Sequence, residues 1–404
     1  MSKIKNIKAK KILDSRGNPT VEVGLKTEKG VFEASVPSGA STGKNEAVAL
    51  GAEKAVENVN KIIAPRLIGK DPTKQKEIDE LMIEVDGTEN KSKLGANAIL
   101  PVSIAVCRAG AFVNELPLYK YIAEIFNYKL PTINYKLPIP CFNIINGGAH
   151  ADNDLEIQEF MVIPQKNSFA KNFQKGKEVY QNLKSIFKKE FGEKGIVIGD
   201  EGGFSPPISK DAEALEFLKS ASENFKDIKL GVDCAATQLY QRGKYELDEK
   251  KISREELMGF YLDLAKKYPI IFLEDPFYEE DWEGWKMLMS DVKSKMLNFL
   301  IIGDDLTVTN KERVEKAIKE NCISGIIVKP NQIGTITEVL ETVKVARQTD
   351  LKIIVSHRSG ETMDDFIADL AVGIGADFIK SGAPTKKERL VKYNRLLKIE
   401  NELK

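Results

Sequence analysis

The sequence predicts an α/β fold in which strands and helices alternate through most of the chain, as in a closed barrel or an open parallel sheet. Short apolar runs that are rich in β-branched residues recur through the second half of the chain, and each ends on charged residues. Successive charged ends lie roughly 23 to 41 residues apart, which leaves room for one helix and two loops. The beginning of the chain has a different pattern, with turn clusters between strand-like runs.

The strand-like runs bring their charged ends to one place. Because the carboxyl ends of parallel strands meet at one edge of a sheet, we expect four acids, two lysines and a His-Arg pair to lie together. The runs are 196–201, 230–233, 270–275, 299–305, 325–329, 353–358 and 377–380. Their charged ends are Glu201, Asp233, Glu274, Asp304, Lys329, His357 with Arg358, and Lys380.

Turn residues divide the N-terminal stretch into short strands. Clusters at 14–19 and 28–30 predict an antiparallel meander. Arg16, in the first turn, is interpreted as a structural or interface residue in preference to a catalytic one. The loop 36–43 consists of small residues, which can wrap backbone amides around an anion or can simply be flexible.

Helices follow the meander, so the N-terminal stretch combines strands and helices. Apolar stripes predict helices over 55–63 and 94–111, and Pro101 should kink the second helix or begin another. The periodicity then lapses, and a Leu-Pro-Ile-Pro run indicates the entry to a new domain. We predict a cap domain at 1–127 and a strand–helix domain at 138–404.

Capping boxes predict the start of two helices in the second domain. They are Ser253-x-x-Glu256 and Thr309-x-x-Glu312. The first precedes an apolar stripe with the i, i+3, i+4, i+7 spacing of a core-facing helix. We expect the stripe Leu257, Phe260, Tyr261 and Leu264 to be structural.

The overall composition indicates a cytoplasmic protein. Lys and Arg together number 60, as do Asp and Glu, so no net field attracts nucleic acid or an anionic membrane. The polar N-terminus lacks a signal-peptide core, and we expect no membrane span. The four cysteines lie far apart without metal-binding spacing, which is typical of buried hydrophobic residues in a reducing compartment.

Three successive strands end on acids that could bind a metal ion together. Asp233, Glu274 and Asp304 provide only carboxylate oxygens, a ligand set that suits Mg²⁺ better than zinc. The alternative for each acid taken singly is a helix N-cap or half of an ion pair. Their succession, facing a lysine on the next strand, favours the metal site.

Several other residues suit proton transfer and anion binding. Glu159 and Glu201 are acids outside the metal set, and we expect an acid near another carboxylate to have a raised pKa and to donate a proton near neutral pH. We expect the metal and Lys380 to lower the pKa of Lys329, so that it acts as a base. Together with the metal triad, these groups predict proton abstraction beside a carboxylate, followed by loss of the hydroxyl on the next carbon.

The two histidines lie in Gly- and Ser-rich loops that could hold an anion. His150 follows Asn-Gly-Gly-Ala, and His357 lies between Ser356 and Arg358, with Ser359 next. The arginine could hold a carboxylate or phosphate through paired N–H donors. The alternatives are a buried core histidine and a surface loop that happens to carry an arginine.

These motifs, in this order, resemble the enolase (phosphopyruvate hydratase) family nearly from end to end. They are DSRGNPTVEV (14–23), VPSGASTG (36–43), KLGANAIL (93–100), NGGAHADN (146–153), QEFM (158–161), GDEGGF (199–204), GVDCAAT (231–237), LEDPF (273–277), GDDLTVTN (303–310), VKPNQIGT (328–335), SHRSGET (356–362) and IKSGAP (379–384). No single motif identifies the family, whereas their completeness and order do.

The resemblance implies a role for each matching residue. Lys329 would take the α-proton of 2-phosphoglycerate, and Glu201, assisted by Glu159, would help the hydroxyl leave to give phosphoenolpyruvate. The first Mg²⁺ would be bound by Asp233, Glu274 and Asp304, and a second, arriving with substrate, by Ser41. The implied substrate contacts are His150, Gln158, Ser356, His357, Arg358, Ser359 and Lys380.

The resemblance also implies the fold and the assembly. It predicts an α+β cap on an atypical (β/α)₈ TIM-like barrel whose second strand is antiparallel. It predicts a homodimer or an octamer of dimers. Some enolases bind plasminogen through lysines, which directs attention to Lys404, but a solvated tail is the favoured interpretation.

The chain departs from the family pattern near residue 50, where a short segment that includes an Arg-Asp pair is missing. Pro101 stands where glycine is usual, and Lys386 where arginine is usual. Two alternatives to a glycolytic and gluconeogenic enolase remain. One is a superfamily relative, such as an acid-sugar dehydratase or muconate cycloisomerase, and the other is a non-enzymatic binding protein on an enolase scaffold.

Overall fold

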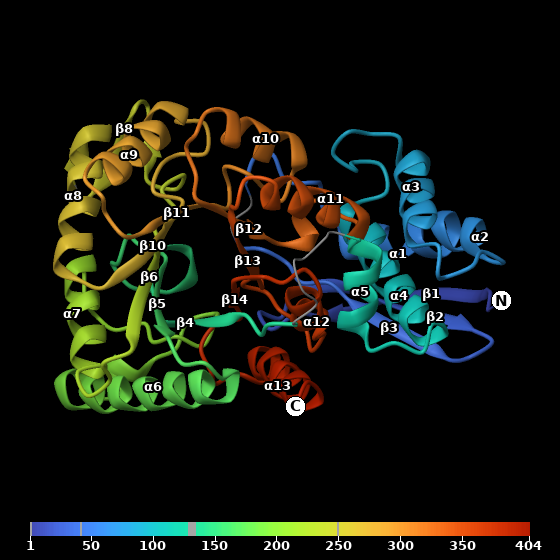
Figure 1. Cartoon of the computed structure of the whole chain (residues 1–404), viewed down its shortest axis with the longest axis horizontal. Coiled ribbons are helices and arrows are strands. Elements are labelled where there is room, and N and C mark those ends of the chain that lie inside the picture. Colours follow the sequence, from blue (N-terminus) through green and yellow to red (C-terminus); the bar gives the residue numbers. More distant parts are fainter. Residues whose placement is uncertain (1, 41–42, 128–134, 249) are drawn as a thin grey trace.

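The computed structural model describes residues 2–40, 43–127, 135–248 and 250–404. It consists of a small α+β cap and a larger barrel, which lie side by side in Figure 1. The cap is drawn in blue and cyan, and the barrel in green to red. The fold is therefore the predicted combination of an α+β cap with an α/β barrel.

The cap begins with the predicted antiparallel meander, in the order β1-β2-β3. Its strands are β1 (Ile4–Leu13), β2 (Pro19–Thr27) and β3 (Val31–Ser35). In the first turn Asp14 accepts the N–H groups of Arg16 and Asn18 at 2.9 and 2.8 Å. These bonds replace the ladder pairing that the turn lacks.

Helices cover one face of this sheet. They are α1 (Ala52–Asn58), α2 (Ala64–Leu67), α3 (Gln75–Asp86), α4 (Ala96–Val113) and α5 (Leu118–Phe126), with a π-helical turn at Val59–Ile63 between the first two. The helix α4 runs on through Pro101, so no second helix begins there. Among the described residues, α4 is the one helix long and apolar enough to span a membrane, but 78% of it is buried within the protein. It is the central helix of the cap core.

Eight strands close into a barrel. In order around it they are β4 (Ile139–Asn146), β5 (Glu159–Pro164), β6 (Ile228–Asp233), β10 (Ile270–Glu274), β11 (Leu300–Gly303), β12 (Gly325–Val328), β13 (Lys352–Ser356) and β14 (Phe378–Lys380), which pairs again with β4. The strand β5 is antiparallel to both of its neighbours, and the other pairs are parallel. This closure excludes an open sheet and confirms the antiparallel second strand.

The barrel is filled and covered by apolar residues. Its interior is a cluster of buried side chains: Cys141, Met161, Ile163, Phe272, Ile302, Ile327, Ile354 and Phe378. Around it lie α6 (Phe169–Phe191), α7 (Asp211–Ala221), α8 (Arg254–Lys267), α9 (Trp282–Ser294), α10 (Lys311–Lys319), α11 (Ile336–Arg347), α12 (Phe366–Gly373) and α13 (Lys387–Glu402). A small sheet of β7 (Tyr240–Gln241), β8 (Lys244–Leu247) and β9 (Lys250–Ile252) precedes α8.

One of the predicted strands is wrong. The run 196–201 follows a 3₁₀ turn and forms no barrel strand, and its apolar side chains Val197 and Ile198 are 55% and 43% exposed. Glu201 therefore comes from a loop. The barrel instead takes β4 and β5 from the preceding stretch, for which the pattern analysis predicted no strands.

Of the two capping boxes, only the first is correct. Ser253 and Glu256 cap α8 reciprocally. At α10 the cap is Asn310, whose side chain accepts the N–H groups of Glu312 and Arg313. Thr309 has φ +54°, and its hydroxyl is bonded to Gln332 across the barrel mouth. A tertiary hydrogen bond thus takes the hydroxyl that local sequence assigned to the helix.

Buried polar contacts join the cap to the barrel. Arg108 of α4 binds Asp364, after β13, at 2.6 and 2.8 Å. Asp79 of α3 is fully buried and accepts both the N–H and the hydroxyl of Thr337 on α11, at 3.0 and 2.7 Å. Burial raises the pKa of Asp79 to about 6, despite these hydrogen bonds.

We expect Asp79→Asn to remove a pH dependence of stability. Because the folded state holds the Asp79 proton more tightly than the unfolded state, stability is lost as pH rises from about 4 to about 6. Relative to the wild type, the variant should gain about 3 kcal/mol across this window. Urea unfolding at several pH values measures it. The exposed neighbour Glu80, changed to Gln, should follow the wild type, and parallel curves for all three proteins would refute the assignment.

Candidate active site

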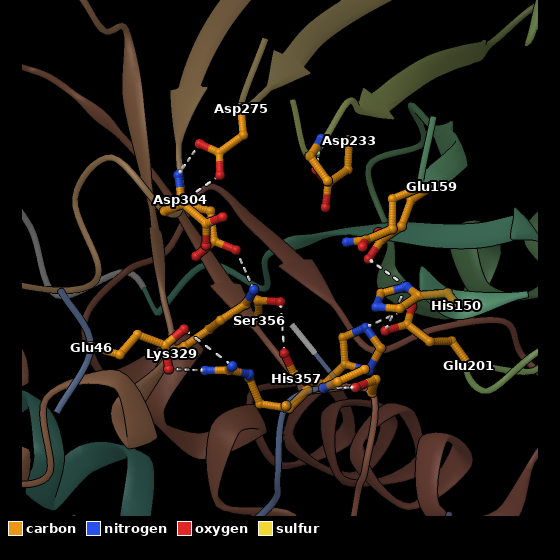
Figure 2. Close-up of a pocket in the computed structure, with 17 residues that line it drawn as sticks. Glu46, His150, Glu159, Glu201, Asp233, Asp275, Asp304, Lys329, Ser356 and His357 are labelled. Atoms are coloured by element: carbon orange, nitrogen blue, oxygen red, sulfur yellow. Dashed lines mark hydrogen bonds and ion pairs between the residues drawn. The ribbon is translucent and has the colours of Figure 1, made fainter. Parts of the chain in front are cut away.

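A polar cavity opens at the mouth of the barrel where the parallel strands end. Figure 2 shows Lys329 and Asp304 on one side of this cavity, and Glu159, His150 and Glu201 on the other. The lining comes from strand ends, from the loop that holds Glu201, and from the segment after β3. Its members are Gly39, Ala40, Glu46, His150, Gln158, Glu159, Glu201, Asp233, Ala235, Asp275, Asp304, Asp305, Lys329, Ser356, His357, Arg358 and Ser359.

A closed ring of contacts holds Lys329, which directly follows β12. Its Nζ forms an ion pair with Asp304 Oδ2, and its backbone N–H donates to Thr309 Oγ1 at 2.9 Å. Thr309 donates to Gln332 Oε1 at 2.7 Å, and Gln332 Nε2 returns to Asp304 Oδ1 at 2.8 Å. The positive φ of Thr309 is a strained backbone that this ring maintains.

The ion pair decides the pKa of Lys329. Burial alone lowers the pKa of this ammonium, but the attraction of Asp304 outweighs it, and the pKa is raised. The sequence-based expectation of a lowered pKa for Lys329 is therefore wrong when only the charges of the protein act on it. It took account of the neighbouring cations, whereas the carboxylate of Asp304 lies directly against the ammonium.

A second buried lysine lies among three acids. Lys380 Nζ is 2.7 Å from Glu274 Oε2, 3.0 Å from Glu159 Oε2 and 3.5 Å from Asp233 Oδ2. Burial would lower its pKa, but the three carboxylates raise it well above the usual value. Burial and the neighbouring charge of Asp233 raise the pKa of Glu274 well above its usual value, so the three acids are not all ionised beside the one ammonium.

The two remaining acids differ in pKa. Burial and the charge of Glu201 raise the pKa of Glu159 to about 8. Burial also acts to raise the pKa of Glu201, but contacts with His357 and His150 lower it well below the usual value. The raised pKa predicted for an acid beside another carboxylate is confirmed at Glu159 but does not occur at Glu201. The reason is that Glu201 faces two imidazoles, at 3.3 and 3.6 Å.

The predicted anion clamp is already engaged with the protein. Arg358 is buried and binds both carboxylate oxygens of Glu46 at 2.9 and 3.2 Å. Ser359 Oγ accepts the N–H of Ala40 at 2.7 Å, which ties the clamp to the small-residue loop. Gln158 Oε1 accepts from Gln238 Nε2 at 3.0 Å. The clamp is therefore preorganised by neighbouring polar groups.

The acids could hold a metal ion. Two groups have ligand atoms within 4.8 Å of one another: His150 with Glu159 and Glu201, and Asp275 with Asp304 and Asp305. In addition, Asp233 and Glu274 meet at Lys380, and Glu274 Oε1 is buried without a hydrogen-bond partner among the described residues. The group without histidine, and the strand-end acids with their unpaired buried oxygen, offer only oxygen ligands, which fit a hard cation.

Comparison with known families decides the identity of this arrangement. A family model described as the enolase N-terminal domain matches residues 4–122. A second, described as the enolase C-terminal TIM barrel domain, matches residues 134–404 and so covers the whole cavity lining from the barrel. The chain belongs to the enolase family.

In this enolase family member, the sequence predicted most of the cavity lining. The predicted residues that line it are His150, Gln158, Glu159, Glu201, Asp233, Asp304, Lys329, Ser356, His357, Arg358 and Ser359. Glu274 and Lys380 contact this group from strand ends. Ser41 lies outside the described residues.

Sequence reasoning missed several residues around the enolase-family site. Glu46 pairs with Arg358, Gln332 with Asp304, and Asn143 Nδ2 with Glu201 Oε2 at 2.9 Å. Asp275, with φ +43°, accepts the backbone N–H groups of Asp304 and Asp305 at 2.8 and 2.7 Å. A signal existed only for Asp275, because an acid follows Glu274 directly. The others act across the fold.

We expect Thr309→Val to destabilise the protein through the ring around Lys329. The valine leaves the buried Lys329 N–H and Gln332 Oε1 without partners, at a cost of about 1–3 kcal/mol each. Urea unfolding measures the loss. Thr349→Val, in an exposed turn, is the matched control and should change little. Equal stability of the two variants would show that the ring contributes nothing.

Proposed function

We propose that the chain is a phosphopyruvate hydratase, a lyase that reversibly dehydrates 2-phospho-D-glycerate to phosphoenolpyruvate with Mg²⁺ in glycolysis and gluconeogenesis. The observation that carries this proposal is the arrangement of the cavity: the buried Lys329 faces the buried acids Glu159 and Glu201 across it (Figure 2). Arg358 is part of the same lining. In this arrangement a base and an acid would lie on opposite sides of one bound molecule, which supports the proposal.

The first step is proton abstraction by Lys329. Its neutral Nζ takes the proton from C2, and the electron pair of the broken C–H bond moves onto the substrate carboxylate. If Asp233, Glu274 and Asp304 held Mg²⁺, its charge would stabilise the resulting dianion, and Asp304 would no longer be free to raise the pKa of Lys329. Lys380 adds a fixed ammonium beside the same acids.

The second step is loss of hydroxide from C3. The electron pair returns to form the C2–C3 double bond, the C3–O bond breaks, and Glu201 gives its proton to the departing hydroxide, which leaves as water. Glu159, with a pKa of about 8, holds a proton at neutral pH and is its source. His150 Nδ1 lies 3.7 Å from Glu159 Oε1 and 3.6 Å from Glu201 Oε1, between the two acids.

The substrate anions would exchange places with protein carboxylates. The phosphate would bind to Arg358, Ser356, Ser359 and His357. It would replace Glu46, whose carboxylate is bound to the Arg358 guanidinium in the structure. The proposed contacts also include His150, Gln158 and Lys380, with Ser41 binding the second Mg²⁺. We further propose a cytoplasmic homodimer or octamer of dimers; the free, buried state of all four cysteines supports a reducing compartment.

We expect the purified protein to convert 2-phosphoglycerate to phosphoenolpyruvate, followed by its ultraviolet absorbance, and to stop when EDTA removes Mg²⁺. Metal-dependent product supports reaction and substrate together. Activity confined to a non-phosphorylated sugar acid would instead identify a superfamily dehydratase. A folded, metal-loaded protein without activity on either would indicate a binding role.

The two proton-transfer roles can be separated by isotope exchange. Lys329→Ala should lose turnover and also the exchange of the C2 proton with D₂O, because no base remains. Glu201→Gln should lose turnover yet retain exchange, since abstraction precedes loss of hydroxide. Lys352→Ala, an exposed lysine at the opposite end of the adjacent strand, is the control and should behave as the wild type. Turnover by Lys329→Ala would rule out its assignment as the base.

A further inference from the structure

A buried arginine outside the cavity lining holds the site from behind. Arg389 lies in the first turn of α13 with none of its surface exposed. Its Nη1 donates to Nδ1 of His357 at 2.5 Å and to the carbonyl of Arg358 at 2.7 Å. Its Nη2 donates to the carbonyls of Ser359 at 2.6 Å and Asp200 at 3.3 Å. The reaction steps above do not use this side chain.

This contact determines which nitrogen of His357 carries a proton. A guanidinium has only N–H donors and keeps its charge in proteins. The nitrogen that faces Arg389 must therefore offer a lone pair, which places the imidazole proton on Nε2. Protonation at Nδ1 would set two donors against each other inside the protein. Burial also lowers the pKa of His357 to about 4, so the imidazole is neutral near pH 7.

The tautomer in turn distinguishes the two oxygens of Glu201. His357 Nε2 lies 3.3 Å from Glu201 Oε2, and Asn143 Nδ2 donates to the same oxygen at 2.9 Å. An oxygen that accepts two hydrogen bonds is not the one that carries the carboxyl proton. The other oxygen, Oε1, lies 3.6 Å from His150 Nδ1, which is itself 3.7 Å from Glu159 Oε1.

We propose that Arg389 is a positioning residue, which fixes His357 as the neutral Nε2–H tautomer and thereby assigns the transferable proton of Glu201 to Oε1. The catalytic consequence rests on the proposed function, whereas the tautomer does not. Without Arg389 the Nδ1–H tautomer becomes available, and Nε2 then accepts. Glu201 would then donate a hydrogen bond to Nε2 of His357 from a proton on Oε2. That proton would point away from His150 and Glu159.

The chain offers a matched control on the same helix. Arg395 of α13 binds both oxygens of Asp369 at 2.7 Å and Glu402 at 3.0 Å, and it touches none of the cavity residues named above. Arg395→Met therefore removes a paired arginine from α13 without changing the surroundings of His357. Arg389→Met removes every donor to His357, and Arg389→Lys keeps one cationic donor.

The first measurement is the tautomer itself. The chain has only two histidines, so ¹⁵N-histidine labelling and two-bond ¹H–¹⁵N correlation give two imidazole patterns, assigned by comparison with His357→Asn. We expect His357 of the wild type and of Arg395→Met to show a protonated Nε2 and an unprotonated Nδ1. In Arg389→Met both nitrogens should shift toward a tautomer average. A wild-type His357 with a proton on Nδ1 overturns the proposal without any variant.

The second measurement is the kinetic consequence, with 2-phosphoglycerate as substrate. For Arg389→Met we expect kcat to fall about 10- to 100-fold with a smaller change in KM, as for loss of an orienting partner. Arg389→Lys should recover part of kcat, and Arg395→Met should match the wild type. A changed tautomer with unchanged kcat refutes the assignment of Oε1. If Arg389→Met does not fold, Arg389→Lys decides the kinetic part.

The two proposals fail in distinguishable ways. An inactive wild type with the expected His357 pattern refutes the proposed function and leaves the tautomer assignment standing. An active wild type with a proton on Nδ1 of His357 refutes the positioning role and leaves the function standing.

Discussion

Compensation of buried charge is the constraint on which this barrel mouth depends. Lys380 is held by Glu159, Asp233 and Glu274, Lys329 by Asp304, and Arg358 by Glu46. Removing such groups from water costs several kcal/mol per ion, which only close pairing offsets. The pairs therefore fix one another's positions. The pKa of each side chain therefore depends on the charges of its neighbours, as the raised pKa of Glu159 illustrates.

The same compensation suits the site to exchange partners. An incoming anion can replace Glu46 at Arg358, and a divalent cation can replace an ammonium at the strand-end acids, with little change in the net charge that the protein buries. Each exchange frees a protein group: a carboxylate in the first case and, in the second, the Lys329 ammonium, which has then lost the contact that raises its pKa. In the proposed reaction this lysine becomes the base once it has given up its proton, so binding and activation are coupled.

Behind the charged groups lies a layer of neutral hydrogen bonds and backbone contacts that orients them. Thr309 and Gln332 link Lys329 to Asp304, and Asp275 holds the backbone of Asp304. The donors and acceptors in these hydrogen bonds are buried and have partners, so the bonds fix the positions of the side chains without adding charge. Arg389 belongs to this layer by position, although it is charged, because its donors end on backbone carbonyls and one imidazole.

The sequence by itself determined the α/β alternation, the barrel strands β6 and β10 to β14, and most residues that line the cavity. These follow from local signals, namely β-branched runs with a charge at the end. Only the tertiary structure decided that 196–201 is a loop, that Asn310 caps α10, and that the pKa of Lys329 is raised while that of Glu201 is lowered. The physical reason is that these depend on partners far away in the chain: a pKa or a cap is set by the nearest charge or donor in space, which sequence spacing does not specify.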